Sequence, residues 1–132
     1  MALQRFRGAI SDRRWARLGL AAIFAASGTL HLVRPELYLP LMPDILPAHH
    51  ALILISGAAE LACAAGLIAN TRWASPASVA LLLAILPGNI HFALATAADP
   101  QAPPWLVVGA WLRVPLQLPL IWAAVADRPT RT

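Results

Sequence analysis

The sequence has 132 residues, of which 59% are hydrophobic and 12% charged, and its mean hydropathy is +0.66. A soluble domain carries about twice that charged fraction, so this chain has too few polar residues to cover a water-facing surface. The single cysteine, Cys63, excludes an intrachain disulfide or a CxxC motif. The net charge of +4 comes mainly from the chain ends, which excludes the folded basic face of a nucleic-acid-binding protein.

Four segments are apolar and long enough to cross a bilayer, which takes about 20 residues of helix. Pro76 suits the first turn of the third, where a helix needs no N–H donor. The sequence therefore predicts an all-α membrane protein: one transmembrane domain spanning residues 1–132, folded as a four-transmembrane-helix bundle. The predicted spans are 15–33, 51–70, 76–98 and 105–126.

The arginines predict the orientation of these spans. All ten cationic side chains are arginine, and most lie before the first span, between the second and third, or in the tail. The positive-inside rule then places both termini in the cytoplasm. The N-terminal segment also resembles a signal peptide with Arg13-Arg14, but three later spans favour a retained signal anchor. The arginines that set the orientation are Arg5, Arg7, Arg13, Arg14, Arg17, Arg72, Arg128 and Arg131.

The segment between the first two spans reads RPELYLPLMPDILPAHH. Its four prolines prevent a long regular helix, yet it is too apolar for a loop in water. Two interpretations follow: a connector lying in the membrane interface, or a lid over a site at the extracytoplasmic mouth of the bundle. The residues of the lid hypothesis are Tyr38, Met42, Pro43 and Pro47.

Several polar side chains lie inside the predicted spans, where they are costly and therefore candidates for function. Counted from the outer end of each span, Glu60, Asn89, Arg113 and Gln117 fall within roughly 6 Å of depth at 1.5 Å per residue. We therefore expect one buried polar layer that forms a ligand site. Its predicted members are His31, Glu60, Asn89, His91, Arg113 and Gln117.

Glu60 and Arg113 are the clear opposite charges at matching depth, so we expect them to form an ion pair. Such a pair has three interpretations: a purely structural contact, a site for a polar ligand group, or a proton-handling site. His31 and His91 lie on different spans without a carboxylate nearby, which disfavours a metal or haem site. With no nucleophile–base set or nucleotide-binding motif, we predict no catalytic residues and no enzyme activity of the chain alone.

The chain resembles the DoxX-like family of small four-helix membrane proteins over residues 27–126. The resemblance rests on His31 with downstream Pro35, the prolines Pro43 and Pro47, SGAAE with Glu60, LPGNIH, and LRVPLQLPLIWAA with Arg113, Pro115 and Gln117. It implies a four-helix fold in a bacterial cytoplasmic (inner) membrane and an association with redox complexes.

The leading functional hypothesis is an accessory or quinone-contacting subunit of a membrane redox system, with quinone as the candidate cofactor. Its expected partners are the lipid bilayer, a membrane or peripheral redox protein, and further copies of the chain. A quinone head group needs one or two hydrogen-bond donors at the edge of an apolar pocket, and His31, His91, Arg113 and Gln117 are the candidates. The alternatives are a component of a small proton or solute transporter, with Glu60 as titrating group, and a purely structural assembly factor.

Overall fold

A computed structural model describes residues 1–126, except for the side chains of residues 2, 6, 7 and 9–11. Within this part the chain forms helices and no strand, and the tail arginines Arg128 and Arg131 lie outside it. A 3-10 helix, η1 (Pro35–Leu41), lies between the first two α-helices. The four α-helices are α1 (Ala2–Val33), α2 (His49–Ile68), α3 (Ala74–Ala98) and α4 (Pro104–Ala126).

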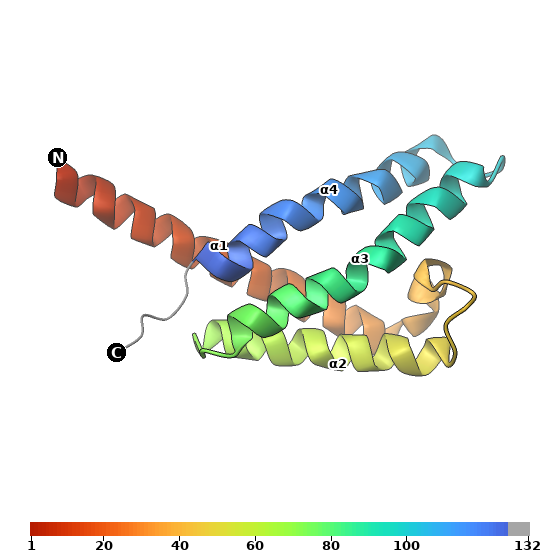
Figure 1. Cartoon of the computed structure of the whole chain (residues 1–132), viewed down its shortest axis with the longest axis horizontal. Helices are drawn as coiled ribbons and strands as arrows, with labels where there is room; N and C mark the ends of the chain where they lie inside the picture. Colours follow the sequence, from red (N-terminus) through yellow and green to blue (C-terminus); the bar gives the residue numbers. More distant parts are fainter. Residues whose placement is uncertain (127–132) are drawn as a thin grey trace.

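The helices confirm the predicted all-α class with four segments long and apolar enough to cross a membrane. These segments are Asp12–Val33, His49–Ile68, Ala74–Ala98 and Pro104–Ala126, close to the predicted spans. α1 begins at Ala2, well before the predicted span, because the preceding residues include several good helix formers and no proline. In Figure 1 this first part of α1 extends past the other helices. The chain is a multi-pass membrane protein.

The surface of the helices suits a lipid environment. Large apolar side chains such as Ile55 and Leu118 are mostly exposed. The tryptophans near the helix ends are exposed as well, as expected for side chains that lie at the two membrane–water interfaces. These tryptophans are Trp15, Trp73, Trp105 and Trp122.

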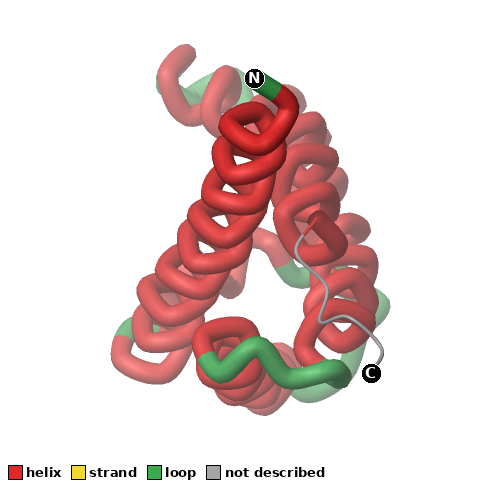
Figure 2. The backbone as a smooth tube through the Cα atoms, turned by 90° about the vertical axis from the view of Figure 1, so that its left-hand side faces the viewer, coloured by secondary structure: helices red, strands yellow, loops and turns green. Residues whose placement is uncertain are grey.

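The helices pack as two antiparallel hairpins, α1 with α2 and α3 with α4 (Figure 1). α1 also packs against α4, and α2 against α3. Within the described chain, the diagonal pairs α1 with α3 and α2 with α4 do not touch. Figure 2 shows the backbone of these long helices from the side. α2 and α4 therefore face each other across a diagonal of the bundle.

Two glycines allow the close approach of α1 and α2. A Cβ atom added to Gly57 would lie 2.6 Å from the Cβ of His31 and 2.9 Å from the carbonyl oxygen of Gly28. A Cβ added to Gly28 would lie 2.7 Å from the carbonyl oxygen of Gly57. Small residues bring helix backbones together in a bilayer in this way. The contact holds the outer part of α1 directly against α2.

The tightest packing lies at the end of the molecule near the α2–α3 connection. From there α3 and α4 diverge from α2 towards η1, which lies beside the opposite end of α2 (Figure 1). The region near η1, called the η1 end below, is therefore where space opens between α2 and α3. The packed cluster comprises Leu20, Ala21, Phe24, Cys63, Ala64, Leu67, Ala74, Leu82, Ala123 and Ala124.

α2 ends in a well-defined turn. Asn70 adopts a left-handed conformation (φ 54°), which asparagine tolerates better than most residues. The Thr71 N–H then donates to the Gly66 carbonyl at 2.9 Å, and the Asn70 N–H to the Leu67 carbonyl at 3.2 Å, the two bonds of a Schellman motif. The Arg17 guanidinium on α1 also donates to the Leu67 carbonyl. The last carbonyls of α2 are thus satisfied without water.

At the other end of α2, Ala48 holds a left-handed backbone conformation (φ 51°, ψ 50°) as the N-cap residue. This conformation costs a non-glycine residue about 1–2 kcal/mol. Ala48→Gly is therefore expected to raise the free energy of unfolding by about 1 kcal/mol, measured by thermal or SDS-induced unfolding. The matched control Ala51→Gly, inside α2, should lower it by roughly 0.5–1 kcal/mol. Destabilisation by both changes would contradict the assigned conformation of Ala48.

Candidate functional site

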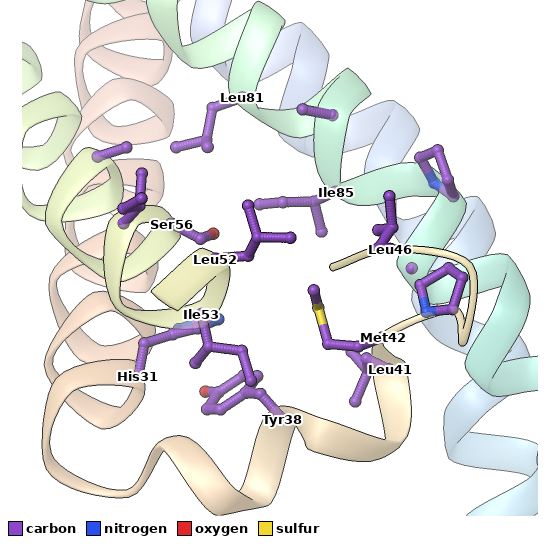
Figure 3. Close-up of a pocket in the computed structure, with 16 residues that line it drawn as sticks. His31, Tyr38, Leu41, Met42, Leu46, Leu52, Ile53, Ser56, Leu81 and Ile85 are labelled. Carbon is purple, nitrogen blue, oxygen red and sulfur yellow. The ribbon is translucent and has the colours of Figure 1, made fainter. Parts of the chain in front are cut away.

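A cavity of about 340 Å³ lies at the η1 end, between α2, α3 and the segment that joins α1 to α2 (Figure 3). Ligand sites typically span roughly 300–1,000 Å³, so this volume suits one ring-sized group rather than a large ligand. Nearly all of its walls are apolar. The lining residues are His31, Tyr38, Leu41, Met42, Pro43, Leu46, Leu52, Ile53, Ile55, Ser56, Ala59, Leu81, Ala84, Ile85, Pro87 and Gly88.

The pocket opens on the apolar outer surface of the helices. Ile55 on α2 and Leu46 in the connecting segment both line it, and their exposed fractions are 64% and 41%. Pro87 and Gly88 of α3 line the opposite wall. Exposed apolar side chains therefore border the mouth of the pocket.

The polar edge of the pocket is His31, the last ionisable side chain of α1. The Gly28–Gly57 contact places Ser27 and His31, one helical turn apart, against α2. His31 Nδ1 donates to the Ser27 carbonyl at 2.7 Å and lies 3.1 Å from Glu60 Oε2. The Ser27 hydroxyl donates to Glu60 Oε1 at 3.3 Å. Ser27, His31 and Glu60 therefore form one buried polar cluster across the α1–α2 contact.

Tyr38 covers the imidazole of His31. The centroids of the two rings are 3.5 Å apart and their planes differ by 21°, a stacked arrangement. Figure 3 shows both side chains at the floor of the pocket, with Tyr38 carried by η1. Nearby, the Arg34 guanidinium donates to the exposed carboxylate of Glu36, and this bond lowers the pKa of Glu36. Arg34 and Glu36 thus form an exposed ion pair at the start of η1.

The expected ion pair between Glu60 and Arg113 is wrong. Glu60, only 3% exposed, pairs with His31 of the neighbouring α1. α2 and α4 are a diagonal pair that does not touch, so residues at matching depth on these helices are not neighbours. The Arg113 guanidinium instead lies over the Phe92 ring on α3, 5.9 Å from its centroid.

Asn89 and Gln117 occupy the contact between α3 and α4. Both are about 95% buried, and the side-chain oxygen of each has no hydrogen-bond partner among the described residues. Asn89 lies one turn before Phe92 on α3 and Gln117 one turn after Arg113 on α4. Because these helices are antiparallel and Arg113 packs on Phe92, Asn89 and Gln117 lie at a similar level. His91 is half-buried on α3 and has no polar partner in the described chain. None of these four polar residues lines the pocket.

The structure thus divides the predicted polar layer into two groups. His31 and Glu60 form the cluster at the pocket, and the others lie along α3 and α4. Of the predicted lid, Tyr38, Met42 and Pro43 line the pocket, whereas Pro47 is exposed and outside it.

Sequence reasoning missed Ser27 and the apolar walls of the pocket. The four-residue spacing of Ser27 and His31 was a usable signal, because it puts both on one helix face. The walls carried no such signal, since an apolar side chain facing a pocket looks the same in sequence as one facing lipid.

Comparison with known proteins gives a family and no function. No curated protein and no solved structure matches the chain. The family model DUF8561, described as a domain of unknown function, matches residues 20–128, which include most of the first apolar span, the other three apolar helices and the pocket. The chain therefore belongs to the DUF8561 family.

Proposed function

We propose that this protein binds a membrane-soluble molecule with a ring-sized polar head group, of the quinone class, and serves as an accessory or quinone-contacting subunit of a membrane redox system. The observation that carries the proposal is the apolar pocket with one imidazole, His31, at its inner edge. A quinone matches both features, because its ring is apolar and its carbonyls accept hydrogen bonds at the rim. The apolar mouth beside Ile55 leaves room for an isoprenoid tail in the lipid.

In this proposal both termini lie in the cytoplasm and η1 lies at the opposite side of a bacterial inner membrane. Exposed arginines support the orientation: Arg13 and Arg14 begin the first span, and Arg72 lies in the α2–α3 turn, at the same end of the molecule. The resemblance to DoxX-like proteins supports the membrane and the redox setting. The electrons would come from a partner membrane or peripheral protein, and further copies of the chain could complete the assembly.

Filling the pocket tests the proposal. Ala59 on α2 lines the pocket, whereas its neighbour Ala58 is exposed and outside it. Ala59→Phe should reduce the affinity for a decyl benzoquinone by at least about tenfold, because the new ring occupies the space of the head group. Affinity is measured by titrating the protein in lipid nanodiscs and following quenching of its tryptophan fluorescence.

The control Ala58→Phe adds the same side chain to the lipid-facing surface and should leave the affinity unchanged. Equal affinities of the wild type and of both variants would place the quinone elsewhere and would refute the pocket as its site. Absence of quinone binding to the wild-type protein would refute the proposed function itself.

A further inference from the structure

The hydrogen bonds of His31 determine which of its nitrogens is left for a ligand. Three oxygens lie near Nδ1: the carbonyl of Ser27 at 2.7 Å, Oε2 of Glu60 at 3.1 Å and the Ser27 hydroxyl at 3.4 Å. A carbonyl only accepts, so Nδ1 must carry a hydrogen. The described chain gives Nε2 no hydrogen-bond partner. Nε2 is therefore the one polar atom that His31 can offer to a molecule in the pocket.

The surroundings of Glu60 indicate the charge of that imidazole. The Ser27 hydroxyl donates to Oε1 of the carboxylate, while Oε2, which has no hydrogen-bond partner in the described chain, lies 3.1 Å from His31 Nδ1. Only 3% of Glu60 is exposed. Burying a single unpaired charge costs several kcal/mol of folding free energy. The cation that can compensate it at contact distance is a doubly protonated His31. The cluster is then neutral overall, and Nε2 also carries a hydrogen.

No other described group around His31 offsets the electrostatic attraction between His31 and Glu60. Tyr38 on η1 stacks on the ring as a neutral side chain, and Ser27 on α1 is neutral. Arg113 on α4 is the other charged side chain to consider, and its guanidinium lies over the Phe92 ring. Coulomb energy falls with distance, so the contact with the Glu60 carboxylate dominates.

We infer that Glu60, as a positioning residue, holds His31 as a charged hydrogen-bond donor and thereby makes the pocket selective for head groups with a carbonyl over those with a hydroxyl. The inference rests on the proposed function and specifies the form of the ligand: the oxidised quinone rather than its hydroquinone. A carbonyl oxygen accepts the Nε2–H without an opposing proton, whereas a hydroxyl must turn its own hydrogen into apolar walls. Hydrogen bonds from charged donors are about twice as strong as neutral ones.

The test compares decyl benzoquinone with its chemically reduced hydroquinone, bound to the wild-type protein in nanodiscs. We expect the oxidised form to bind about tenfold more tightly, because the hydroquinone leaves a hydroxyl hydrogen without an acceptor in the apolar pocket. Infrared difference spectra should show the carbonyl stretch of the bound quinone shifted to lower frequency than in lipid alone. Equal affinities of the two forms, or an unshifted carbonyl stretch, would overturn the inference while leaving quinone binding intact.

Glu60→Gln removes the charge that stabilises the imidazolium. In a variant shown to be folded by its thermal transition, the tenfold preference should fall to about twofold or less, and the carbonyl stretch should return towards its value in lipid. The control Glu36→Gln makes the same chemical change at an exposed position outside the pocket and should alter neither readout. A folded Glu60→Gln protein with wild-type preference and stretch would overturn the role of Glu60. If Glu60→Gln does not fold, the wild-type comparison decides the inference by itself.

Discussion

Gly57→Ala is expected to lower the free energy of unfolding by about 3 kcal/mol, at the upper end of the cost of overpacking a well-packed interior. The added Cβ would lie 2.6 Å from the Cβ of His31 and 2.9 Å from the carbonyl oxygen of Gly28. One of these atoms lies on the backbone and the other is fixed next to it, so α1 and α2 must move apart. SDS-induced unfolding followed by tryptophan fluorescence measures the effect.

The chain supplies a matched control for this change. Gly109 also lies inside an apolar helix, but a Cβ added there meets no atom within 4 Å. Gly109→Ala should therefore stabilise the protein slightly, by up to roughly 1 kcal/mol, because alanine is the better helix former. Similar stabilities of the two alanine variants would show that α1 and α2 do not approach each other at Gly57.

The second large effect concerns the His31–Glu60 pair. His31→Leu leaves the Glu60 carboxylate buried without its counter-charge and is expected to cost about 3–5 kcal/mol. The double variant His31→Leu/Glu60→Leu removes both charges and should recover most of this loss, since replacing a whole buried pair by apolar side chains is often neutral. Unfolding free energies of the two single variants and the double variant form the cycle that measures the coupling.

The same double-mutant cycle applied to Glu60 and Arg113 serves as the control. Because α2 and α4 do not touch, the coupling between Glu60 and Arg113 is expected to stay below about 0.5 kcal/mol, as for separated sites. A strong coupling of Glu60 to Arg113 with a weak coupling to His31 would support the pairing expected from the sequence and would refute the one described here.

The sequence predicts the helices well because their signal is local. An apolar run of bilayer length needs no tertiary information, and the polar connections at Asn70 and Asp99 mark where spans end. The seven-residue η1 was not predicted, because four prolines argue against a long helix but not against a short 3-10 turn. The depth count grouped Glu60 with Asn89, Arg113 and Gln117, and His31 belonged to the predicted layer without falling within that depth.

The pairing within that layer could not be read from depth alone. Depth says how far along a helix a residue lies, whereas pairing depends on which helices are neighbours. Glu60 and Arg113 share a level but lie on diagonal helices, while Gly28 and Gly57 bring His31 to Glu60. The pocket could not be predicted from the sequence for a related reason. It lies where α2 and α3 diverge, and the angle between two helices cannot be inferred from any single residue.

The proposed function requires that the pocket at the η1 end binds a quinone head group beside His31. A decyl benzoquinone with a photoreactive group on its ring, crosslinked in nanodiscs and mapped by mass spectrometry, tests it most directly. The account predicts adducts on Tyr38, Met42 and Ile53, and their loss in Ala59→Phe. Adducts spread instead over exposed residues of α4, such as Leu112 and Leu118, and unaffected by Ala59→Phe, would contradict it.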